Sequence, residues 1–209
     1  MDLTISSEKI GNPLLVELLR KLTNSFSKMD KEFYVIGATA RDIVIQQLLD
    51  TESKRRTRDL DIAIAIPDWE TFEQVKQSLI ADGFEKSSDM QQRFYYGEYE
   101  IDIVPYGVVA KEDDKIYWPP EEEIAMSVKG FDEVLSEAIT VSIDDDFKVK
   151  IASLHGLLLL KFNAWLDRNT QTSKDAEDMS FIFSNYFLAN LEKKFIKKYM
   201  TGKTLMITL

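Results

Sequence analysis

Residues 57–66, TRDLDIAIAI, alternate strictly from Asp59 onward, and this pattern constrains the fold more than any other stretch. Successive side chains of a β-strand point to opposite faces, so one face here carries only leucine and isoleucine. The other face carries Asp59 and Asp61, followed by two alanines. Such alternation predicts a half-buried strand of a sheet that covers an apolar core. Two neighbouring carboxylates repel each other unless a cation or solvent separates them, so the acidic face needs its own explanation.

Further strands and helices are expected around this strand. Strands are predicted at 33–38, 92–97, 98–107 and 138–143, and helices at 13–29, 39–50 and 68–81. Thr39 is the expected N-cap of the second helix. From Phe147 onward the pattern becomes helical. The chain is therefore predicted to be an α/β (α+β) protein, with an α/β domain at 1–145 and a helical lobe at 146–209.

The composition sets bounds on location and partners. The 209 residues include no cysteine, which excludes disulfides and favours a reducing, cytoplasmic location. The N-terminal stretch lacks the features of a secretory signal, and the leucine run at 157–160 is too short to span a membrane. A net charge of −10 disfavours broad binding of nucleic acid, which depends on phosphate contacts. Basic clusters at 54–58 and 193–203 are local exceptions.

Three aspartates on predicted strands form the candidate metal site. Asp59 and Asp61 share a face of the first strand, and Asp102 lies on a later strand, in EYEIDIVPY. If the two strands are neighbours, the three carboxylates converge. Converging carboxylates bind hard cations such as Mg²⁺ or Mn²⁺. Two such ions roughly 3.5–4 Å apart can hold a triphosphate and activate an attacking oxygen.

A glycine turn precedes the acidic strand. In VIGATARD, Gly37 ends one predicted strand and opens the next helix. Glycine lets the backbone approach a phosphate closely, and a helix N-terminus attracts anions. The ordered combination of this turn, a D-x-D strand and a third strand aspartate is far more specific than any one of them.

This combination resembles the DNA polymerase β-like nucleotidyltransferase superfamily, whose pattern is a glycine turn, a D-x-D strand and a later strand aspartate. GATARD and TRDLDIAI are also similar to the GGxxRD and DxD pair of CCA-adding tRNA nucleotidyltransferases. Residues 161–179, KFNAWLDRNTQTSKDAEDM, are similar to the K…R…KDxxD stretch of AbiEii-type nucleotidyltransferases, which include toxins of toxin–antitoxin pairs.

The resemblance implies a mixed sheet flanked by helices, an NTP substrate, Mg²⁺ or Mn²⁺, and an antitoxin partner. It implies that Lys161 contacts phosphates and that Asp175 and Asp178 act in catalysis or nucleotide binding. The predicted catalytic residues are Asp59, Asp61, Asp102 and Asp175. The predicted nucleotide-binding residues are Gly37, Ala38, Thr39, Arg41, Lys161 and Asp178.

Each of these residues also has a purely structural explanation. Amphipathic strands usually expose polar residues on their outer face. Lys161 fits a lysine that extends from the edge of the core, and Arg41 fits a local pair with Asp42. The helix dipole alone favours Asp175 and Asp178 near a helix start.

The predicted reaction is transfer of an NMP from NTP to an acceptor hydroxyl. RNA, particularly a tRNA end, is the acceptor implied by the resemblance, with a toxin-like role. A small, antibiotic-type acceptor is the enzymatic alternative. A third alternative is an inactive nucleotide-binding interaction protein, and Ala38 supports it because alanine replaces the second glycine or serine of the turn.

Overall fold

The fold is built around one eight-stranded mixed sheet. The structure, a computed structural model, describes residues 2–49, 58–120, 122 and 125–186. The strand order is β1-β9-β10-β2-β3-β6-β5-β4. These strands are β1 (Asp2–Ile5), β9 (Ile139–Ile143), β10 (Phe147–Ile151), β2 (Tyr34–Ile36), β3 (Asp59–Ala65), β6 (Tyr99–Tyr106), β5 (Arg93–Tyr96) and β4 (Glu85–Lys86). A separate antiparallel pair consists of β7 (Lys115–Tyr117) and β8 (Ala125–Ser127).

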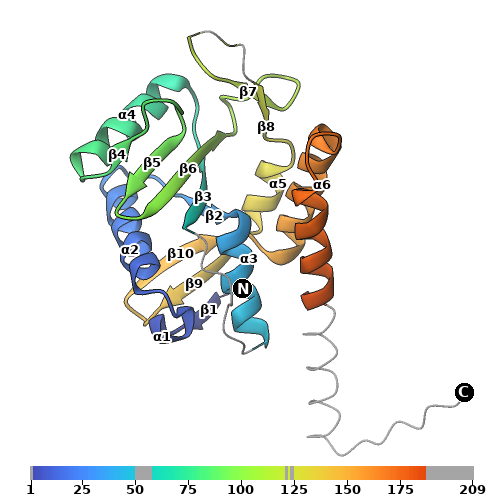
Figure 1. The fold of residues 1–209 in the computed structure, drawn as a ribbon. Coiled ribbons are helices and arrows are strands. Elements are labelled where there is room, and N and C mark those ends of the chain that lie inside the picture. Colours follow the sequence, from blue (N-terminus) through green and yellow to red (C-terminus); the bar gives the residue numbers. More distant parts are fainter. Residues whose placement is uncertain (1, 50–57, 121, 123–124, 187–209) are drawn as a thin grey trace, which may run out of the picture.

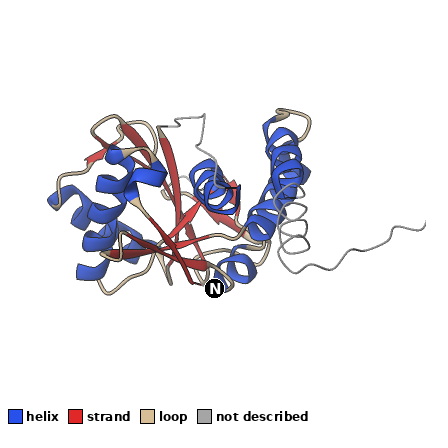
Figure 2. Cartoon of the chain, turned by 90° about the horizontal axis from the view of Figure 1, so that it is seen from below, coloured by secondary structure: helices blue, strands red, loops and turns tan. Residues whose placement is uncertain are grey.

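Helices cover both sides of this sheet, as Figures 1 and 2 show. Helices α2 (Pro13–Lys28) and α4 (Trp69–Ala81) lie on one side, and α6 (Leu154–Arg168) lies on the other with a helix at 174–186. Helix α3 (Gly37–Leu49) packs on β3 and also contacts α6, while α5 (Phe131–Ser136) packs on α6. A short α1 (Ser7–Ile10) precedes α2. The predicted mixed sheet flanked by helices is confirmed.

Strand β3 lies at the centre of the sheet, and it is half-buried, as its alternating pattern predicts. It pairs antiparallel with β2 and parallel with β6. Leu60, Ile62 and Ile64 are fully buried on one face, whereas Asp59 is exposed and Asp61 is half-buried on the other. The apolar face therefore belongs to the core, and the acidic face opens toward α3 and α6.

The helix after β2 begins earlier than predicted. It starts at Gly37, and Thr39 lies inside it instead of capping it. The Thr39 hydroxyl donates a hydrogen bond to the carbonyl oxygen of Asp59 at 3.1 Å. The predicted N-cap is therefore wrong, because this side chain ties the first turn of α3 to the start of β3.

The prediction of helices from Phe147 onward is wrong for its first five residues. These residues form β10, which pairs with β9 on one side and β2 on the other, inside the main sheet. The helical part begins at Leu154, where Ser153 caps α6. The division into 1–145 and 146–209 stays a prediction. Residues 54–57 and 193–203, which hold most of the basic clusters, lie outside the described residues.

Within the described ranges, no helix combines the length and apolar character needed to cross a bilayer.

Candidate active site

The β3–β6 ladder brings Asp61 and Asp102 directly opposite each other. The two strands are parallel neighbours, with Asp61 paired with Asp102 and Asp59 paired with Glu100. Paired residues project to the same face of a sheet, so these carboxylates share one acidic face. Glu100 was not predicted as a site residue. The signal was present, since the alternation in EYEIDI places Glu100 and Asp102 on one face.

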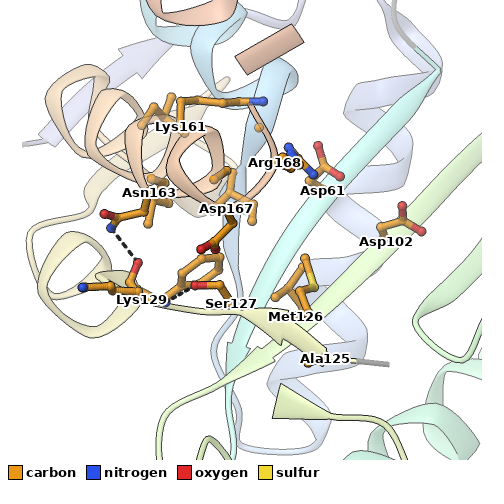
Figure 3. A pocket seen from close by; sticks show the side chains of 17 residues that line it. Asp61, Asp102, Ala125, Met126, Ser127, Lys129, Lys161, Asn163, Asp167 and Arg168 are labelled. Carbon is orange, nitrogen blue, oxygen red and sulfur yellow. Dashed lines mark hydrogen bonds between the residues drawn. The ribbon is translucent and has the colours of Figure 1, made fainter. Parts of the chain in front are cut away.

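A pocket of about 410 Å³ opens between this acidic face and α6 (Figure 3). Asp61 and Asp102 line the sheet side, and Lys161 and Arg168 line the side formed by α6. The lining also includes Gly37, Met126, Ser127, Lys129, Asn163 and Asp167. The pocket thus has an acidic wall and a wall with basic side chains. Apart from Gly37, Asp61, Asp102 and Lys161, these lining residues were not predicted, because β8, α5 and α6 meet only in the folded chain.

Gly37 touches the carboxylate of Asp61. The backbone of Gly37 has φ +67°, and a Cβ added there would lie 2.1 Å from Oδ2 of Asp61. Only glycine leaves room for the carboxylate and adopts this conformation without strain. The glycine turn therefore supports the acidic strand, in addition to any contact with a ligand.

The environment of Asp61 makes its negative charge costly. Burial raises its pKa first, and the neighbouring charges of Asp102 and Asp59 raise it further. Lys161 and Arg93 oppose this effect, and the resulting pKa is about 6. A cation placed beside Asp61 would relieve this repulsion.

Asp102 is held by an arginine that sequence analysis missed. Arg93 on β5 is the cross-strand partner of Asp102, and its Nε and Nη2 donate to the two carboxylate oxygens at 2.8 Å each. Its Nη1 lies 2.7 Å from Oε2 of Glu100. These hydrogen bonds raise the pKa of Arg93, which therefore stays charged.

Asp175 is fully buried beneath the basic wall. Nε and Nη2 of Arg168 donate to its two oxygens at 2.6 and 2.8 Å, and Nζ of Lys161 lies 3.4 Å away. Burial raises the pKa of Asp175, but Arg168 and Lys161 outweigh burial and the net shift is downward. Asp175 is not among the described residues that line the pocket.

Asp178 joins α3 to the helix at 174–186. Its Oδ2 lies 2.8 Å from Nζ of Lys161, and its Oδ1 accepts a 2.6 Å hydrogen bond from Nη1 of Arg41. Arg41 is buried, also donates to Asp42, and lies over the ring of Phe181. The local pairing of Arg41 with Asp42 is therefore present. Asp178 and Arg41 are likewise outside the described pocket lining, as are Ala38 and Thr39.

A match to a family model identifies the family of this chain. A family model of the nucleotidyl transferase AbiEii toxin of type IV toxin–antitoxin systems matches residues 18–207. The chain belongs to the AbiEii nucleotidyltransferase family. The predicted family and the predicted transferase class are thereby confirmed. No curated protein sequence matches the chain.

Three solved structures are similar to this AbiEii-family chain to different degrees, and the first of them shares its fold. ANT(2'')-Ia in complex with adenylyl-2''-tobramycin is 14% identical, with 89% of this chain and 99% of that chain covered and a TM-score of 0.50. The lincomycin-bound lincosamide antibiotic adenylyltransferase LnuA is 20% identical, with 80% and 95% covered and a TM-score of 0.47. A CCA-adding enzyme with ATP is 20% identical over 51% of this chain and 24% of that chain, with a TM-score of 0.32.

The acidic face of this AbiEii-family chain supplies the ligand type that Mg²⁺ and Mn²⁺ prefer. Asp61 and Asp102 offer carboxylate oxygens from adjacent strands. Burial, and then the charges of Asp102 and Asp59, raise the pKa of Asp61, and a cation would favour its charged form. Among the described residues, no three acidic or histidine side chains lie close enough together to bind one metal ion. Asp59 is exposed and lies outside the described lining. The donor chemistry of Asp61 and Asp102 fits a divalent cation, whereas the described residues do not bring Asp59 to the same point.

Proposed function

We propose that this chain transfers a nucleoside monophosphate from an NTP to an acceptor hydroxyl in the pocket between β3, β6 and α6. The observation that carries this proposal is the pairing of an acidic wall, Asp61 and Asp102, with the basic side chains of Lys161 and Arg168 in one pocket. Phosphoryl transfer depends mainly on positioning and on neutralising negative charge. Nucleotidyl transfer needs both walls, because carboxylates hold the cation and basic groups hold the phosphates.

Asp61 and Asp102 would hold Mg²⁺ or Mn²⁺ in the pocket, and Asp59, which is exposed on the same face of β3, would complete the site. A bound divalent cation would neutralise phosphate charge and make the acceptor oxygen a stronger nucleophile. Gly37 keeps space for the Asp61 carboxylate. The acceptor oxygen attacks the α-phosphorus as the bond to the leaving pyrophosphate breaks, and an oxygen of Asp102 accepts the hydroxyl proton.

The basic wall would bind the triphosphate. Lys161 lines the pocket and contacts phosphate oxygens in this proposal. Asp175 and Asp178 both pair with Nζ of Lys161 and are outside the described pocket lining, which supports a positioning role. Carboxylates paired in this way hold a long basic side chain in one orientation, so binding of the nucleotide does not bear the entropic cost of ordering it.

The acceptor we propose first is RNA, particularly a tRNA end, with a toxin-like role and an antitoxin as partner. The AbiEii toxin family to which the chain belongs supports this proposal. A small hydroxylated molecule is the second candidate. It is favoured by the net charge of −10, which opposes broad RNA binding, and by the modest pocket volume.

The test is incubation of the purified chain with each labelled NTP, Mg²⁺ or Mn²⁺, and either total cellular RNA or a small-molecule extract. Label should appear in one acceptor fraction, and EDTA should abolish the transfer. A folded Asp59→Asn, Asp61→Asn double variant should be inactive.

Retained transfer in that folded double variant would end the metal assignment. NTP binding by calorimetry without transfer to either fraction would instead favour the inactive nucleotide-binding alternative.

A further inference from the structure

One row of side chains crosses three neighbouring strands of the sheet. Asp61 on β3 is the direct partner of Asp102 on β6, which is the direct partner of Arg93 on β5. The row thus begins at Asp61, a carboxylate of the pocket wall, and ends at the positively charged Arg93. Arg93 lies outside the described pocket lining, so a nucleotide in the pocket would meet it only through Asp102.

The Arg93 contact has the geometry of a fork. Two of its nitrogens donate to separate oxygens of Asp102, and its third nitrogen pairs with Glu100. Bidentate arginine–carboxylate pairs fix orientation as well as charge. Each carboxylate oxygen has two lone-pair positions, so this fork leaves one on each oxygen of Asp102 available. Asp102 can therefore remain a base or a ligand while Arg93 fixes its plane.

Arg93 also places positive charge next to the acidic face. Its Nη2 lies 2.8 Å from Oδ2 of Asp102, whose direct strand partner is Asp61. The side chain of Arg93 is 24% exposed, so solvent screens its charge only in part. A divalent cation entering beside Asp61 and Asp102 would meet this repulsion before any phosphate is present.

We propose that Arg93 is a positioning residue for nucleotidyl transfer, which orients Asp102 and weakens divalent-cation binding until an NTP supplies compensating negative charge. This inference rests on the proposed function of the same pocket. It explains why the sheet places an arginine beside a carboxylate that the reaction needs. A merely structural pair would change the free energy of unfolding and leave cation affinity and turnover unchanged.

The first test measures Mn²⁺ binding to the full chain by electron paramagnetic resonance, without nucleotide. For a divalent cation, a unit charge about 6 Å away changes affinity about tenfold even at the dielectric constant of water, about 80. Arg93→Gln should therefore bind Mn²⁺ about tenfold more tightly than the unaltered chain. Arg93→Lys keeps the charge and should bind Mn²⁺ within about twofold of it.

The second test measures transfer. Arg93→Lys cannot form the fork, so kcat should fall about tenfold or more, while the KM for NTP changes little. Arg20→Gln is the matched control, because it removes another arginine–carboxylate pair, with Asp146, away from the pocket. This control should leave both Mn²⁺ affinity and kcat unchanged.

The outcomes separate this inference from the proposed function. Transfer by the unaltered chain, together with unchanged Mn²⁺ affinity in folded Arg93→Gln, would overturn the role of Arg93 alone. Full kcat in Arg93→Lys would also overturn it. If Arg93→Gln does not fold, the result with Arg93→Lys is the decisive one. A chain that neither binds Mn²⁺ nor transfers label would overturn both proposals.

Discussion

Substitution of Gly37 by alanine tests whether the glycine turn exists to make room for Asp61. The added Cβ would lie 2.1 Å from Oδ2 and 2.9 Å from Cγ of Asp61. Real Cβ contacts shorter than 3.0 Å essentially do not occur, so the carboxylate must retreat by roughly 1 Å. A displacement of about 1 Å in a catalytic group can reduce the rate about 100-fold.

The stability cost of the same change should be modest. Alanine at φ +67° costs about 1–2 kcal/mol relative to glycine. The atom that must move belongs to a side chain, and an off-rotamer shift adds only about 1 kcal/mol. Gly37→Ala should therefore remain folded, with an unfolding free energy lower by about 2–3 kcal/mol.

Gly97→Ala is the matched control. Gly97 has a similar φ of +57°, but nothing lies within 4 Å of the position that a Cβ would occupy. The control therefore has a similar backbone strain but no steric clash with a neighbouring side chain. Urea denaturation gives the two unfolding free energies, and label transfer at saturating NTP gives the two rates. Equal activity in the two folded variants would refute the argument that Gly37 maintains the position of Asp61.

Two further outcomes follow from the site. The pKa of Asp61 in the folded chain, about 6, lies above its ordinary value of 3.8. Between about pH 4 and pH 6 the folded state therefore binds more protons than the unfolded state. As pH rises through this range, ionisation of Asp61 lowers the stability of the metal-free fold. Asp61→Asn should therefore be more stable than the unaltered chain at pH 7.5, by urea denaturation, and lose most of this advantage by about pH 4. Lower stability at pH 7.5 would contradict the stated cause. Asp175→Asn, which weakens the pairing with Arg168 and Lys161, should lower the unfolding free energy by about 1–3 kcal/mol. It should also reduce kcat, and unchanged turnover would show that Lys161 needs no such positioning.

Much of the local structure was predictable because short-range patterns encode it. The alternation at 59–66 predicted β3, and the acidic face of that strand became one wall of the pocket. Helix α4 begins one residue after the predicted start, where Asp68 accepts a hydrogen bond from the amide of Thr71. Such elements depend on residues a few positions apart, so the sequence displays them directly.

Strand β10 shows why other elements were missed. FKVKI alternates, but it has only five residues and directly precedes a long apolar helix. Its strand partners include β2, more than 100 residues earlier in the chain. A short run becomes a strand when a distant edge is available to pair with it, and periodicity alone does not reveal that edge.

By itself, the sequence determined the residue chemistry of this site: the D-x-D strand, the preceding glycine, and the lysine and KDxxD aspartates that indicated the family. Only the tertiary structure decided which of these groups are paired, which are buried and which line the pocket. Strand register placed Asp102 between Asp61 and Arg93, and helix packing buried Asp175 while leaving Lys161 at the pocket. The physical reason is that charge and periodicity are properties of neighbouring residues. Burial, register and ion-pair choice depend on segments that meet only when the chain folds.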